Sequence, residues 1–118
     1  NKKGEAAYHA GNIESSIYFY QQAIELNPRN GQFYSNLGLS FQKNSNEAEA
    51  LWANRKAIEF ASGTNAKTVK ASSYYNIAKI YESNSQWNNA LQYYKLAKQN
   101  KANPVYDKAI LRVSSKIR

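Results

Sequence analysis

Apolar and small residues along the chain recur at the spacing of amphipathic helices. Tyr34, Leu37 and Phe41 follow one another at i, i+3 and i+7, which places them on one face of a helix. The polar residues at 44–46 interrupt this pattern, and residues 48–60 form a second amphipathic stretch. The pattern therefore predicts two helices joined by a short turn.

This helix–turn–helix pattern occurs three times. Aligning Gly4 with Gly38 and Ala78 gives steps of 34 and then 40 residues. The same steps bring small residues into register in some columns and mostly bulky residues in others, which indicates an array of helical repeats. The small columns are Ser16/Ala50/Ala90, Ala23/Ala57/Ala97 and Gly11/Ser45/Ser85, and the mostly bulky ones are Ile17/Leu51/Leu91, Tyr20/Asn54/Tyr94 and Ala7/Phe41/Tyr81.

The step lengths divide a single domain into three repeats. Repeat 1 covers residues 1–30, repeat 2 covers 31–64 and repeat 3 covers 71–104. Because the second step is longer than the first, we expect a linker insertion at 65–70 that lengthens the connection or the adjoining helix ends. Residues 105–118 carry apolar side chains at helical spacing, and they form either a capping helix or the first helix of a fourth repeat.

Particular residues mark the helix ends. Gly11 permits a tight turn, and Pro28 ends repeat 1 because the residue before a proline avoids helical geometry. Asn12 and Asn46 stand just before second helices, where an Asn side chain can accept a free backbone N–H as an N-cap. We expect the two helices of each pair to cross where small residues face each other, namely Ser16, Ala50 and Ala90 against Gly4, Gly38 and Ala78.

With these positions in place, the sequence resembles tetratricopeptide repeats, which are helix pairs of about 34 residues. The resemblance rests on YSNLGLSF at 34–41, YYNIAKIY at 74–81, the Ala columns and Asn27-Pro28. It covers residues 1–104, with departures where Ala7 and Asn54 replace aromatic residues and where repeat 1 begins partway through its first helix. It implies an all-α fold, a right-handed α-solenoid of three helix–turn–helix pairs with a C-terminal capping helix at 105–118.

Composition removes several classes of function. The 118 residues include one His and neither Cys nor Met, so disulfides, Cys-based zinc sites and Cys–His catalytic pairs are excluded. No glycine-rich phosphate-binding motif occurs, and the apolar runs are too short to span a bilayer. We therefore expect neither catalysis nor a cofactor or metal, and a protein or peptide as the partner.

In tetratricopeptide arrays the first helices line a concave groove, and the resemblance implies that this groove binds a peptide or helix of a partner. The groove residues are those on the first helices that lie outside the packing columns. An Asn amide both donates and accepts hydrogen bonds, and Tyr adds flat apolar area with a polar tip. The expected groove residues are Tyr8, His9, Gln32, Ser35, Asn36, Leu39, Lys43, Tyr75, Asn76 and Lys79.

Family members that bind heat-shock chaperones hold a C-terminal carboxylate with a Lys/Asn/Asn/Lys/Arg clamp on the first helices. Only Asn36 matches this clamp, and the other four places are Asn1, Glu5, Ser72 and Asn76. A groove without that basic cluster is poorly suited to an acidic chain end, which argues against this specialisation.

The net charge of +8 belongs to the C-terminal half of the chain. Residues 1–64 carry equal numbers of basic and acidic side chains, whereas residues 65–118 are strongly basic. In the groove we expect Lys79 to be offset by Glu82. The remaining charge permits a less favoured alternative, binding of nucleic acid or another anionic partner. The basic face for that function would be Lys95, Lys98, Lys101, Lys108 and Arg112.

The composition also bears on biological context. Frequent Asn, Lys and Tyr, together with the style of the repeats, look bacterial, and we expect the domain to be part of a larger protein or assembly. A chain without Cys fits reducing and oxidising compartments alike, so cytoplasm and periplasm both stay open. Apolar faces at the two ends of the array invite end-to-end self-association.

Overall fold

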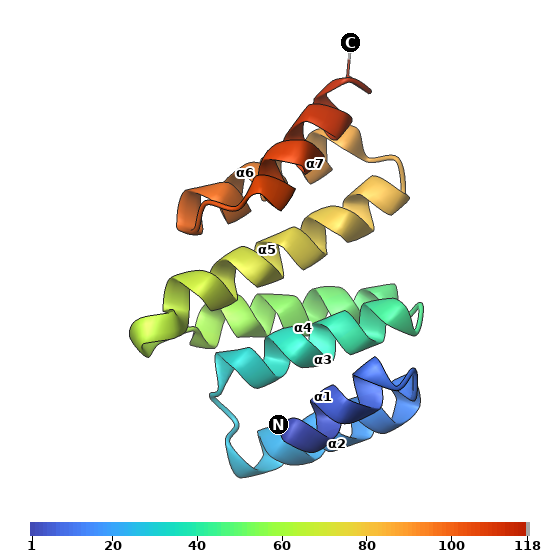
Figure 1. Ribbon diagram of the computed structural model, residues 1–118, viewed down its shortest axis with the longest axis vertical. Coiled ribbons are helices and arrows are strands. Elements are labelled where there is room, and N and C mark those ends of the chain that lie inside the picture. The colour runs from blue at the N-terminus through green and yellow to red at the C-terminus, as the bar shows by residue number, and fades with distance from the viewer. Residues whose placement is uncertain (118) are drawn as a thin grey trace.

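The computed structural model describes residues 1–117, and almost all of them lie in helices. The elements are α1 (Lys2–His9), α2 (Ile13–Leu26), α3 (Gly31–Lys43), α4 (Glu47–Phe60), the 3-10 turn η1 (Gly63–Asn65), α5 (Ala66–Ser83), α6 (Trp87–Asn100) and α7 (Pro104–Ser114). α1 packs on α2, α3 on α4, α5 on α6, and α7 on α6. The pairs stack along the longest axis of a 46 × 30 × 21 Å molecule, with the first helices toward the viewer in Figure 1. This arrangement confirms the predicted all-α solenoid of helix pairs.

The core is a series of small apolar clusters between neighbouring helix pairs. One cluster joins Tyr20 of α2 to Leu37 of α3 and Ala53 of α4. The next joins Tyr34 of α3 and Ala57 of α4 to Val69 of α5. These two clusters each take residues from two pairs, and the other two join the third pair to α7. A single pair therefore does not bury its apolar surface alone, as is typical of repeat arrays.

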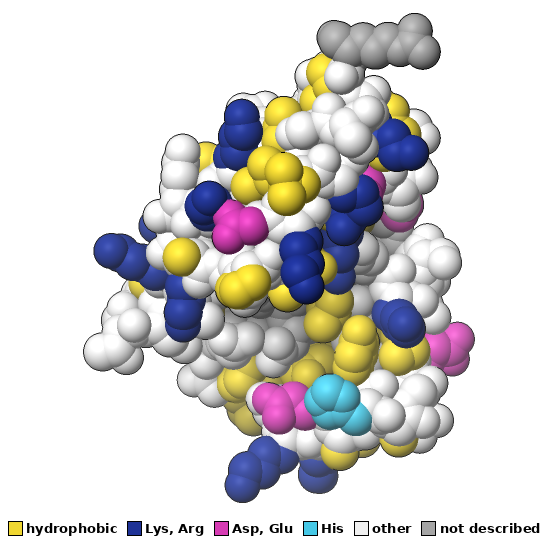
Figure 2. Space-filling view, turned by 45° about the horizontal axis from the view of Figure 1, so that its top comes forward, with side chains coloured by type: hydrophobic (Ala, Val, Ile, Leu, Met, Phe, Trp, Pro, Cys, Tyr) yellow, Lys and Arg dark blue, Asp and Glu magenta, His cyan; other side chains and the backbone are white. Residues whose placement is uncertain are grey.

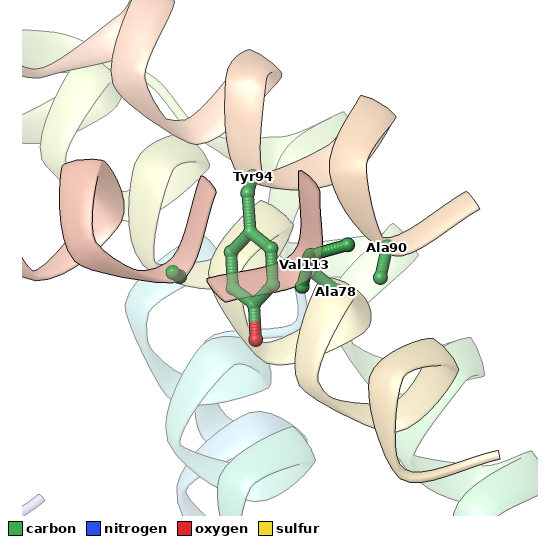
Figure 3. Packing of buried hydrophobic residues seen from close by; sticks show 5 residues of the cluster. Ala78, Ala90, Tyr94 and Val113 are labelled. Atoms are coloured by element: carbon green, nitrogen blue, oxygen red, sulfur yellow. The ribbon is translucent and has the colours of Figure 1, made fainter. Parts of the chain in front are cut away.

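The small columns make room for side chains of the second helices. A Cβ atom on Gly4 would lie 2.6 Å from the ring of Tyr20. A Cβ atom on Gly38 would lie 2.7 Å from Cγ of Asn54. In the third pair, Figure 3 shows the ring of Tyr94 beside Ala78, in the cluster that also contains Ala90 and Val113.

The side chains found at Gly4, Gly38 and Ala78 are thus those of the column Tyr20/Asn54/Tyr94, and Ala90 lies in the same cluster as Ala78. Those small residues, Ser16, Ala50 and Ala90, are fully buried. The helices of each pair therefore cross closely, and the bulky column fills the space beside the crossing.

Equivalent turns adopt the same unusual backbone conformation in all three pairs. Gly11 has a φ of 84°, Ser45 of 63° and Ser85 of 59°. This left-handed region is open to Gly but costs an L-amino acid roughly 1–2 kcal/mol. Gly11 was predicted to permit a tight turn, and the two Ser residues adopt the same turn without that freedom.

The two predicted N-cap residues stand at the expected positions, but their side chains make no capping hydrogen bond. Asn12 and Asn46 directly precede α2 and α4, yet neither side chain caps its helix. Their ψ angle of 74° differs from the extended backbone that aims an N-cap side chain at the first turn. The Asn46 amide oxygen accepts instead from the Asn44 amide at 2.8 Å. Side-chain caps occur at Asn1, Asn30 and Asn103.

The extra residues between repeats 2 and 3 extend a helix. Residues 66–70, which we assigned to a linker insertion, form the start of α5, which is 18 residues long against 13 for α3. Val69 in this extension is buried against Tyr34 and Ala57, and this packing favours helix over loop. Of the two outcomes expected for the insertion, the structure has the longer helix end.

The last helix begins at Pro104, one residue earlier than predicted, and ends at Ser114. Tyr106, Ala109 and Val113 bury its inner face. Leu111 is exposed, so the outer face is not wholly polar. Arg118, which belongs to the predicted capping segment, lies outside the described residues.

Candidate functional site

The first helices α1, α3 and α5 form one face of the molecule and the second helices lie behind them in Figure 1. α3 packs against both α4 and α5. The packing residues Gly4 and Gly38 face the second helices, so the opposite sides of α1 and α3 are turned away from the pair interface. Figure 2 shows a hollow on the molecular surface where hydrophobic side chains lie beside Lys and Arg side chains.

Eight of the ten predicted groove side chains are at least partly accessible. His9 and Lys43 are exposed, and the other six are half-buried. We call these eight residues the groove face: Tyr8, His9, Gln32, Asn36, Leu39, Lys43, Tyr75 and Lys79. Ser35 and Asn76 are exposed by only 3% and 6%, so their prediction as ligand-contacting residues was wrong.

Both misassigned residues bind neighbouring helices instead. The Ser73 hydroxyl lies 3.0 Å from the Ser35 hydroxyl and joins α5 to α3. The Asn76 amide nitrogen donates to the Asn54 amide oxygen at 3.1 Å, and the Asn54 nitrogen donates to the Ala50 carbonyl at 2.9 Å. A buried amide needs such partners. The signal in the sequence was Asn54 itself, a polar residue in a Tyr column that required a polar neighbour.

Asn36 occupies the middle of α3, one helical turn after Gln32. The Gln32 amide nitrogen donates to the Asn36 amide oxygen at 3.0 Å. This bond fixes the Asn36 amide group, and no hydrogen bond joins its nitrogen to another residue among 1–117. An oriented N–H of this kind can donate to a carbonyl of a bound chain. Leu39 adds half-buried apolar surface about one turn further along α3.

Lys79 on α5 is held against aromatic surface. Its Nζ lies 4.7 Å from the centre of the Tyr75 ring, a cation–π distance. The Tyr75 ring in turn packs against Tyr94 and Tyr106, with centroid distances of 5.7 and 5.3 Å. Burial lowers the pKa of Lys79, and the nearby positive charge of Lys43 lowers it further. Tyr75 is therefore partly a packing residue, and Lys79 forms a cationic spot on the groove face.

Comparison with known proteins gives the family. A model described as "TPR repeat" matches residues 4–45, and one described as "Tetratricopeptide repeat" matches residues 71–104. The chain belongs to the tetratricopeptide repeat family. It is a protein-interaction scaffold, and domains of this family are generally non-catalytic.

Two solved structures share the whole fold. The Arabidopsis OM64 TPR domain superposes with a TM-score of 0.87 at 24% identity, covering 98% of this chain and 92% of that one. The N-terminal domain of stress-induced protein-1 (STI-1) from C. elegans gives 0.79 at 24% identity, covering 96% and 90%. At this level of identity the likeness concerns the fold.

The tetratricopeptide array carries an ion pair where we expected a free acid. Glu82 does not offset Lys79, because its carboxylate accepts two bonds from Arg112, at 2.7 and 2.8 Å. It also accepts one from the Tyr94 hydroxyl at 2.6 Å. The bonds from Arg112 are the main cause that lowers the pKa of Glu82. Glu82 thus joins α7 to α5 and α6, and its negative charge is paired with Arg112.

The predicted basic face is partly neutralised. Lys98 pairs with Asp107 at 2.7 Å, and Arg112 is bound by Glu82. Lys101 donates to the Thr68 hydroxyl at 3.0 Å, which leaves its charge unbalanced. Lys95 and Lys108 are exposed. The structure thus leaves three cations of the predicted five without an acid partner among the described residues.

One further pocket was not predicted from the sequence. It has a volume of about 490 Å³ and lies between the second helices α2 and α4 and the first helix α3. We call it the Trp52 pocket, and it is lined by Gln21, Ile24, Tyr34, Leu37, Phe41, Ala48, Glu49 and Trp52. Trp52 is 51% exposed, and a large aromatic residue outside the repeat columns was the available signal.

Within residues 1–117, no helix combines the length and apolarity that crossing a membrane requires.

Proposed function

We propose that this chain binds an extended peptide of a partner protein along its groove face. Among the features of that face, the observation that carries the proposal is the fixed amide of Asn36, because its oxygen is taken by Gln32 and its nitrogen remains to bind a main-chain carbonyl. Half-buried Leu39 on the same helix and half-buried Tyr8 on α1 supply apolar surface. Polar donors beside apolar surface are typical of peptide-binding sites.

The concave groove known for tetratricopeptide arrays supports the same assignment. In this family the first helices provide the binding surface, and here they carry the accessible polar and aromatic side chains. We propose further that the domain has no catalytic role and serves a larger protein or assembly, which the composition favours placing in a bacterium. The partly neutralised charge of the basic face favours a protein over nucleic acid, whose binding needs several free cations.

A selection experiment tests the groove assignment. The immobilised chain is used to select binders from a phage-displayed library of random peptides, and a selected peptide is titrated by fluorescence polarisation. Two double variants are compared: Asn36→Ala with Leu39→Ala on the groove face, and Gln21→Ala with Trp52→Ala in the Trp52 pocket.

We expect the groove variant to lose about tenfold in affinity or more, because a hydrogen bond and apolar contact are removed together. The pocket variant should bind as the unchanged chain does. A library that yields no binder, or a peptide whose affinity falls only in the pocket variant, would overturn the groove assignment. Circular dichroism confirms that both variants fold.

A further inference from the structure

Two lysines of the groove face have no acidic partner among the described residues. Lys43 is the last residue of α3, and Lys79 lies on the neighbouring α5 about one turn before its end. The ion pairs among residues 1–117 are Lys56–Glu59, Lys98–Asp107 and Arg112–Glu82. Neither Lys43 nor Lys79 takes part in them, although each lies close enough to the other for their charges to interact.

This pair is more than a solvated surface charge. Lys79 is half-buried and its ammonium group lies over the Tyr75 ring, and removing a cation from water without an anion nearby is costly. The only carboxylate within one turn of Lys79 on its own helix is Glu82, which Arg112 and Tyr94 occupy. A carboxylate supplied by a ligand would therefore find a preformed, partly dehydrated cationic site.

Apolar surface adjoins both cations. Leu39 precedes Lys43 by four residues, and Tyr75 precedes Lys79 by four residues, so each lysine shares a helix face with an apolar side chain. α3 and α5 are in contact. The result is a patch in which two cations lie beside Leu39 and Tyr75, a surface that suits an acidic residue next to an apolar one.

Resting on the function proposed above, we infer that Lys43 and Lys79 bind the carboxylate of an Asp or Glu side chain inside the partner peptide. An internal side chain fits better than a chain end, because the clamp that holds a terminal carboxylate in this family is matched here only at Asn36. A peptide that contacts both Lys43 and Asn36 spans seven residues of α3, or roughly 10 Å. A long polyanion fits poorly, since Glu5 on α1 is exposed near Tyr20 and Tyr8 and would repel it.

The experiment uses peptides selected on the unchanged chain, and it sets charge removal in the protein against charge removal in the peptide. The variants are Lys43→Gln, Lys79→Gln and the charge-retaining Lys79→Arg. Lys95→Gln is the matched control, because Lys95 is an exposed lysine on α6 without an ion pair among the described residues. Each is titrated with the selected peptide, with its Glu→Gln or Asp→Asn form and with its C-terminally amidated form.

The inference predicts an acidic residue at one fixed position of the selected peptides. Lys79→Gln and the Glu→Gln peptide should each lose about tenfold in affinity, and their combination should lose little more. Lys43→Gln should act in the same direction, and Lys79→Arg and Lys95→Gln should bind nearly as well as the unchanged chain. Added salt should weaken binding of the acidic peptide.

Several outcomes would overturn the inference and leave the groove assignment intact. The first is that the selected peptides lose affinity for the Asn36→Ala, Leu39→Ala variant but share no acidic residue at a fixed position. The second is that the affinity losses of Lys79→Gln and of the Glu→Gln peptide add when the two are combined. The third is that amidation of the peptide's C-terminus weakens binding, which would assign the site to a chain end. A labelled single-stranded RNA is titrated in parallel. Affinity for RNA that depends on Lys43 and Lys79, with none for acidic peptides, would make the site one for nucleic acid.

Discussion

Replacing Glu82 by Gln tests how α7 is held to the array. The Glu82 carboxylate accepts two hydrogen bonds from Arg112 of α7 and one from Tyr94 of α6. Gln has nearly the same shape and keeps an acceptor oxygen, so the substitution removes mainly the charge. Any loss of stability therefore reports the ion pair and not a cavity.

The size of the effect follows from exposure. The Glu82 side chain is 20% exposed and the Arg112 side chain 52% exposed. Charge-assisted hydrogen bonds contribute about 1.5–3 kcal/mol when protected from water, and exposed pairs contribute about 0.2–1 kcal/mol. Because half of Arg112 faces solvent, we expect Glu82→Gln to lower the free energy of unfolding by about 1–2 kcal/mol.

The assay is urea unfolding followed by circular dichroism, applied to a double-mutant cycle of Glu82→Gln and Arg112→Gln. The pKa of Glu82 is lowered in the folded chain, so its contribution is fully present above the unfolded pKa of about 4.3. It is lost as the pH falls through the lower, folded pKa. The difference in free energy of unfolding between the unchanged chain and Glu82→Gln should therefore be largest near neutral pH and should disappear in acid. A coupling energy near zero at neutral pH, or a difference independent of pH, would refute this reasoning.

Three further predictions concern packing and turns. Ala90→Leu should lose about 1–3 kcal/mol of stability by overpacking, because Ala90 is fully buried; an unchanged urea midpoint would contradict the helix crossing. Ser45→Gly should gain about 0.5–1 kcal/mol and Gly11→Ala should lose a similar amount, because both positions have positive φ; melting temperatures that move the other way would refute the strain. Asn54→Leu should cost about 1–3 kcal/mol by leaving the Asn76 amide without its acceptor, and Asn54→Leu with Asn76→Leu should recover part of this in the same unfolding assay.

The sequence was sufficient to predict the architecture, because repeated columns reflect contacts that recur in every pair. Gly4 and Gly38 both face a side chain of the second helix, and Ala90 is buried in one cluster with Ala78. Each such column is three observations of one packing requirement. Periodic spacing therefore determined the helices, their pairing and their stacking.

Local features that occur once were harder to predict. The extension of α5 depends on Val69 packing against Tyr34 and Ala57, which are distant in the chain. Asn46 failed as a cap because its ψ angle and its bond to Asn44 favour another arrangement. Such outcomes depend on tertiary contacts, which outweigh local preference and are not visible in spacing.

The accessibility of the predicted groove residues was predictable in outline, and their hydrogen bonds were not. Eight of the ten side chains are at least partly accessible, but helical spacing did not show that Asn76 is bound by Asn54. Nor did it show that Glu82 is bound by Arg112 and so leaves Lys79 unbalanced. These pairings join different helices, and the choice among several polar neighbours depends on side-chain length and the distance between helices.

The most direct test of the account is to map a library-selected peptide on the chain by two-dimensional ¹H–¹⁵N NMR. The account predicts that the largest chemical-shift changes fall on α1, α3 and α5, centred on the Asn36 side-chain amide and on residues around Lys43 and Lys79. Changes centred instead on α2 and α4 around Trp52 would contradict the claim that the groove face is the binding site.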